Sequence, residues 1–185
     1  MMKKVVWLVF GLLIVASMLL TSCSTSTTAA GPVVLTVTNG STVKTYSLSD
    51  LQKLKVVTGN GGTKGKGGTV TGPNSYQGVA LTTLLNAVGG ITSKQSVKFT
   101  GTDGYSKTLT YDQVMNGGFS TYDGSGNPVT PTAKPILAVV YSSKGAALDT
   151  TVGPVEAGLL SSDNLVTDGN TWIKLLGKID VVAAQ

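Results

Sequence analysis

Residues 97–114 read VKFTGTDGYSKTLTYDQV, and this stretch holds the most informative succession of local signals in the chain. Val97 to Thr100 and Tyr105 to Thr110 have the alternation of β-strands, and Asp103-Gly104 between them is a strong turn signal. Thr110 stands three residues before Gln113, which is the spacing of a capping box at a helix start. The stretch therefore predicts a β-hairpin followed at once by a short helix that ends near Gly117.

Similar signals recur on both sides of this hairpin. Asn39-Gly40 predicts a tight turn between two strands, and Ser49-Asp50-Leu51-Gln52 has the capping-box spacing of a second helix. The expected elements are strands over 33–38, 43–48, 55–58, 136–142, 155–160 and 171–182, and helices over 49–54 and 81–88. Many short strands with a few short helices indicate an α+β fold that is mainly β.

The segment GNGGTKGKGGT, residues 59–69, is the most glycine-rich part of the chain. Consecutive backbone amides and lysines could cradle an anion. However, the glycine spacing matches neither the P-loop nor the dinucleotide-binding pattern. We expect this segment to be an irregular, flexible surface loop, because so much glycine disfavours regular structure.

The N-terminal segment has the layout of a secretory signal. Lys3 and Lys4 precede an apolar run over 5–20, which is too short for a comfortable membrane span. The order Leu20-Thr21-Ser22-Cys23 resembles the bacterial lipobox, which implies cleavage before a lipidated Cys23. The alternative is that Cys23 is a buried residue of an uncleaved helix.

The lipobox resemblance predicts three parts of the chain. Residues 1–22 would be a lipoprotein signal peptide, residues 23–31 the lipidated Cys23 with a flexible tether, and residues 32–185 one folded domain. The expected location is the extracytoplasmic face of the cell membrane, where acylated Cys23 would make the lipid membrane a partner.

Composition excludes several classes of function. The chain has no histidine and one cysteine, so the usual zinc, copper and haem ligand sets and the Ser-His-Asp and Cys-His mechanisms cannot be assembled. Two of the 14 lysines lie in the predicted signal peptide, which leaves 12 against nine acidic residues, or a formal charge of about +3. This charge is too weak and dispersed to indicate nucleic acid binding.

Five blocks of sequence are similar, in order, to the oxidoreductase molybdopterin-binding domain family, which has the sulfite oxidase fold. The blocks are YQGVALTTLLNAVG from Tyr76, VKFTGTDGYSKTLTYDQV from Val97, PILAVVYSSKGAAL from Pro135, GPVEAGL from Gly153 and WIKLLGKIDV from Trp172. The resemblance covers roughly residues 33–182. It implies a mixed-sheet, barrel-like α+β domain that binds molybdopterin.

The resemblance also implies where a cofactor would be bound. Asp103, Gly104, Tyr105 and Ser106 would form a structural corner beside the cofactor cleft, and Gly153 and Pro154 the turn that opens a late strand. Lys174 matches a basic position near the pterin phosphate. Tyr76 and Gly78 would lead into the helix that lines the same side.

The chain departs from the family at the residues that carry its chemistry. The cysteine that ligates molybdenum has no counterpart in residues 59–72, and Glu156 replaces an arginine that could grip an anion in bidentate fashion. We therefore expect a non-catalytic binding or accessory module whose partner is a small polar ligand or another protein. The alternatives are a molybdopterin-dependent oxidoreductase subunit that holds its cofactor without a protein thiolate, and a structural envelope protein.

Overall fold

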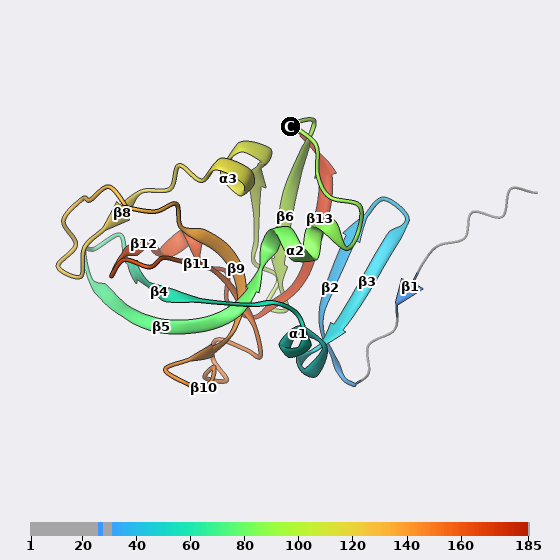
Figure 1. Cartoon of the computed structure of the whole chain (residues 1–185), viewed down its shortest axis with the longest axis horizontal. Helices are drawn as coiled ribbons and strands as arrows, with labels where there is room; N and C mark the ends of the chain where they lie inside the picture. The colour runs from blue at the N-terminus through green and yellow to red at the C-terminus, as the bar shows by residue number, and fades with distance from the viewer. Residues whose placement is uncertain (1–25, 28–30, 185) are drawn as a thin grey trace, which may run out of the picture.

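Two mixed β-sheets and three short helices form the fold (Figure 1), seen in a computed structural model that describes residues 26–27 and 31–184. The first sheet has the order β1-β3-β2-β13-β6-β7. Its strands are β1 Ser26–Thr27, β2 Val33–Asn39, β3 Thr42–Ser47, β6 Gln95–Gly101, β7 Ser106–Thr110 and β13 Leu176–Ala183.

The second sheet has the order β10-β9-β5-β4-β12-β8, and β11 also pairs with β9. Its strands are β4 Val56–Lys64, β5 Val70–Ala80, β8 Thr121–Tyr122, β9 Ile136–Ser143, β10 Ala146–Ala147, β11 Glu156–Leu160 and β12 Val166–Asp168. The helices are α1 Leu48–Lys53, α2 Leu81–Asn86 and α3 Tyr111–Asn116, with a 3-10 turn at Gly169–Thr171. The mainly β, α+β prediction is confirmed, although neither sheet closes into a barrel within these described residues.

The main hydrophobic core is shared by the two sheets and the helices. It contains Phe99 and Ile179 from the first sheet, Val79 and Val139 from the second, and Leu84 from α2. A smaller cluster lies on the opposite face of the second sheet, where Ala138 and Val140 of β9 pack with Leu160 and Trp172. Strand β9 is thus buried on both faces, which explains its continuous apolar sequence.

The hairpin and helix predicted from residues 97–114 are present. β6 and β7 pair antiparallel, and α3 begins directly after β7. The Thr110 hydroxyl accepts from Gln113 N at 3.2 Å, while Gln113 Oε1 accepts from Thr110 N at 3.0 Å. Both halves of the predicted capping box are therefore formed, and the helix ends at Gly117 in the left-handed region.

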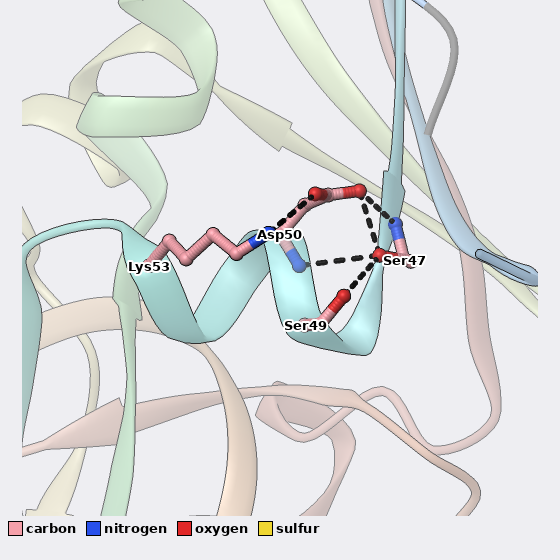
Figure 2. Close-up of polar contacts among 4 residues, drawn as sticks. All are labelled: Ser47, Ser49, Asp50 and Lys53. Atoms are coloured by element: carbon pink, nitrogen blue, oxygen red, sulfur yellow. Dashed lines mark hydrogen bonds and ion pairs between the residues drawn. The ribbon is translucent and has the colours of Figure 1, made fainter. Parts of the chain in front are cut away.

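The capping box predicted at the start of α1 was misplaced by two residues. Ser47, and not Ser49, is the N-cap, and Asp50 is its partner (Figure 2). The Ser47 hydroxyl accepts from Asp50 N at 3.2 Å, and Asp50 Oδ2 accepts from Ser47 N at 3.1 Å. Ser47 ends β3 with an extended backbone, so the strand runs directly into the helix and Ser49 falls inside the first turn.

The prediction that residues 59–69 are irregular was wrong for residues 59–64, which continue β4. The glycines in this part are required by close packing. A Cβ at Gly61 would lie 2.6 Å from Leu159 O and 2.8 Å from Trp172 Cζ2, and one at Gly59 would lie 2.9 Å from Ser161 O. Residues 59–64 are rich in glycine because other segments of the same chain pack closely across this face of β4. Only residues 65–69 form the turn that connects β4 to β5.

Other element boundaries also differ from prediction. The helix expected over 81–88 ends at Asn86, and the strand expected over 171–182 begins at Leu176. Residues 172–175 instead cross between the sheets, with a single bridge between Ile173 and Ala157.

The predicted signal peptide and Cys23 lie outside the described residues. All helices within the described part of the chain are too short or too polar to cross a lipid bilayer.

The contact of Gly61 with Trp172 leads to a stability prediction. Gly61→Ala forces Leu159 or Trp172 to move, and such overpacking destabilises by about 1–3 kcal/mol. We expect urea unfolding of the purified protein to show this loss. Gly67→Ala is the matched control, because nothing lies within 4 Å of a Cβ there. Equal stabilities of the two variants would contradict the close packing of β4.

Candidate functional site

Three of the blocks predicted to border a cofactor cleft do meet in space, at residues 174–175. In the 102–105 corner, Asp103 Oδ1 accepts from Tyr105 N at 3.0 Å, and Thr102 N donates to Leu175 O at 2.7 Å. On the other side, Leu175 N donates to Val152 O at 2.6 Å. The corner and the Gly153-Pro154 turn therefore lie against the same short segment, which contains Lys174.

The side chains of this corner do not form a polar site together. Asp103 is used by its own turn, and Gly104 adopts a φ of +87°, which only glycine takes easily. Tyr105 and Ser106 are exposed. Gly153 is needed because a Cβ there would lie 3.0 Å from Leu175 Cα. The predicted residues of this region thus have structural roles, and the Lys174 side chain beside them is exposed.

Tyr76 and Gly78 lie apart from the corner, on β5 of the second sheet. Gly78 packs so closely on β9 that a Cβ would collide with Val139 O, which explains the glycine without a ligand. Tyr76 lies in the smaller hydrophobic cluster, with its ring centroid 5.0 Å from that of Trp172.

Glu156 connects these two regions, and the site residues predicted from sequence did not include it. It begins β11 and is only 4% exposed. Ala157 and Leu159 face the main core, so alternation places Glu156 with Gly158 and Leu160 on the face of the smaller cluster. Burial raises the pKa of Glu156 from 4.5 to about 7, and Lys174 opposes this shift.

The face beside Glu156 is filled by Trp172. The indole is 6% exposed and lies directly over Gly158, where any Cβ would collide with the ring. Its Nε1 donates to Thr167 Oγ1 at 3.0 Å. Burial also raises the pKa of the Tyr76 hydroxyl, and the negative charge of Glu156 adds to that shift. Tyr76 and Trp172 therefore form a packed cluster on the face of β11 that carries the buried Glu156 carboxyl.

An open cavity of about 260 Å³ lies next to Tyr76. It is lined by Thr58, Gly59, Asn60, Ser75, Tyr76, Gln77 and Gly145. These residues offer hydroxyl and amide groups that both donate and accept hydrogen bonds, and none carries a charge at neutral pH. The cavity suits a small, neutral, polar ligand.

The residues present do not fit molybdopterin. The described residues carry no thiol or imidazole, and within them no three His, Cys, Asp or Glu side chains gather as a metal site. Lys174 is the basic residue that the resemblance matched to the pterin phosphate, yet Glu156 and Asp149 both interact with it. Hydrogen bonds from Thr151 lower the pKa of Asp149 most, and Lys174 contributes. These carboxylates offset the lysine charge that a phosphate would need.

Glu156 could have been suspected from sequence, whereas the packing role of Trp172 could not. The only glutamate of the chain stands in the apolar strand PVEAGLL, and a buried acid needs a reason. The contact of Trp172 with two distant glycines has no local signal.

The raised pKa of Glu156 predicts a pH-dependent stability. Between about pH 4.5 and 7 the folded protein keeps a proton that the unfolded chain has lost, so this carboxyl makes the protein less stable as pH rises. Relative to Glu156→Gln, the wild type should lose roughly 3 kcal/mol of unfolding free energy across this range. Chemical denaturation at several pH values measures the difference. Parallel pH profiles of the two proteins would contradict a buried carboxyl.

Comparison with known proteins finds a similarity of three-dimensional structure. No protein-family model and no curated protein matches the chain. Among solved structures, it is similar to the sulfane dehydrogenase SoxCD from Paracoccus pantotrophus, with a TM-score of 0.56 and 15% identity over 80% of this chain. The chain matches 37% of the SoxCD chain. The likeness shows that the fold is a β-rich, mixed-sheet domain of the sulfite oxidase type.

Proposed function

We propose that this protein is a membrane-anchored extracytoplasmic lipoprotein whose sulfite-oxidase-type domain acts as a non-catalytic binding or accessory module. The observation that carries the proposal is the cluster formed by Glu156, Trp172 and Tyr76. A fold does not by itself confer an activity, so the chemistry must come from the side chains.

The cluster supports a binding role over a catalytic one. A carboxyl with a pKa near 7 could in principle exchange protons at neutral pH. However, Glu156 is 4% exposed and is not among the residues that line the cavity beside Tyr76. A general acid or base must reach its substrate directly or through one water. Glu156 is therefore a buried charge-bearing part of the scaffold.

The cavity beside Tyr76 supports the proposal that the domain binds a neutral polar ligand. Its walls come from adjacent strands, because Gly59 of β4 pairs with Tyr76 of β5. Asn60 is also fixed, since its side chain donates to Asn164 Oδ1 at 2.9 Å. A site on paired strands is more rigid than one on loops, which lowers the entropy lost on binding.

The anchoring part of the proposal rests on the sequence alone. Two lysines and an apolar run precede a lipobox-like tetrapeptide that ends at Cys23, and a polar spacer follows it. A lipid on Cys23 would hold the folded domain near the membrane through a tether of a few residues.

Replacement of Cys23 tests the anchor. Expressed in a bacterial host with its N-terminus intact, the wild-type chain should stay in the membrane fraction after carbonate washing. Cys23→Ser should leave that fraction, because no acyl chain can be attached to serine by this route. Metabolic labelling with a fatty acid provides a second readout. Persistence of Cys23→Ser in the washed membranes would overturn lipid anchoring.

Cofactor content tests the binding-module part. The chain should be produced in a host that makes molybdopterin, purified, and assayed for molybdenum by mass spectrometry and for pterin by fluorescence after oxidative release. We expect neither at a stoichiometric level, in the wild type or in Lys174→Ala. A molybdopterin enzyme purified from the same host is the positive control. Stoichiometric pterin that falls in Lys174→Ala would instead support the oxidoreductase alternative.

A further inference from the structure

A second cavity, of about 370 Å³, opens at the other end of β4. It is lined by Lys64, Gly65, Lys66, Tyr122, Asp168 and Asn170. These residues come from the end of β4 and its turn, from β8, and from the junction of β12 with the 3-10 turn, all of which lie at one end of the second sheet (Figure 1). None of them belongs to the site described above.

One wall of this cavity is held by a chain of polar contacts. Lys64 Nζ lies 4.0 Å from the centroid of the Tyr122 ring and donates to Gly126 O at 2.7 Å. The Tyr122 hydroxyl donates to Asp168 Oδ1 at 3.0 Å. The backbone of Asp168 also pairs with that of Lys64, because β12 and β4 run side by side. These contacts fix an ammonium, an aromatic ring and a carboxylate in place before any ligand binds.

A further ammonium reaches the rim from the first sheet. Lys107 of β7 donates from Nζ to Asn170 O at 2.6 Å. Burial lowers the pKa of Lys107, while Asp168 acts in the opposite direction. Holding a partly buried lysine beside the cavity has an electrostatic cost, which an anionic partner would remove.

Lys66 completes the positive side. It is exposed on the turn after β4, and two backbone hydrogen bonds shape that turn, from Gly65 N to Thr69 O at 2.8 Å and from Gly68 N to Gly65 O at 2.9 Å. The cavity is thus lined by the ammonium groups of Lys64 and Lys66 and the carboxylate of Asp168, and the ammonium group of Lys107 lies beside it. The local charge is positive, although the whole chain is only weakly basic.

We propose that this cavity binds a small hydroxylated anion, such as a sugar that carries a phosphate or carboxylate group. The lysines would bind the anionic group by charge-assisted hydrogen bonds. Asp168 uses Oδ1 for Tyr122, so Oδ2 remains to accept from a ligand hydroxyl, and the Asn170 amide can donate or accept. An anion without hydroxyl groups would make no use of the Asp168 carboxylate, whereas a polyol would donate a hydrogen bond to it.

Calorimetric titration of the purified full chain in detergent tests this proposal with glucose 6-phosphate, glucuronate and uncharged glucose. At least one of the two anions should bind at least tenfold more tightly than glucose, and which one does so distinguishes phosphate from carboxylate recognition. Binding should weaken as salt is added. No binding of either anion at millimolar concentration, or equal affinity for glucose, would overturn the proposal.

Substitutions locate the binding to this cavity. Lys66→Ala and Lys107→Ala should each weaken anion binding about tenfold, the usual order for a charged hydrogen bond. Lys66 is exposed, so its loss should leave the thermal unfolding midpoint unchanged and a binding defect cannot be due to misfolding. Lys94→Ala, an exposed lysine outside the cavity, is the control and should bind as the wild type does. Wild-type affinity in the Lys66→Ala, Lys107→Ala double variant would overturn the assignment. These results do not depend on the anchor or the pterin content.

Discussion

The packing of the Trp172 indole against two glycines is the contact on which the second sheet depends. Gly61 of β4 and Gly158 of β11 both leave room for the ring, and neither could carry a Cβ. Because Trp172 precedes β13, the same side chain ties the second sheet to the segment that leads into the first. The indole also covers Gly158, which lies on the same face of β11 as the buried Glu156.

Local signals explain which elements were predictable. The 97–114 hairpin and its capping box depend on neighbouring residues, so the sequence alone predicted both. The glycines of β4 were misread because the atoms that require them are remote in sequence: Ser161 O lies over Gly59, and Leu159 O and Trp172 lie over Gly61. The cap of α1 was misplaced because Ser47 and Ser49 each stand three residues before a side chain that can complete a box, and only the strand end distinguishes them.

In the candidate site, too, some features could be predicted from sequence and others could not. The corner at Asp103 and the turn at Gly153 both lie against the segment at Lys174, and backbone hydrogen bonds join them. Their contacts are backbone packing, and the polar chemistry lies in Glu156 and in two cavities of different character. One cavity is neutral and polar, and the other is positive. The ligand preferences of such a scaffold follow from these side chains and not from the fold.

The most direct test of this account is the ionisation of Glu156 itself. It is the only glutamate in the chain, so selective ¹³C labelling of glutamate carboxyl groups gives a single side-chain resonance to follow by NMR as pH changes. If Trp172 and its neighbours close the face as described, the resonance should titrate with a midpoint near pH 7, since burial raises the pKa of Glu156 to about 7. A midpoint near 4.5, the ordinary value, would show that the carboxyl is solvated and would contradict the closed cluster.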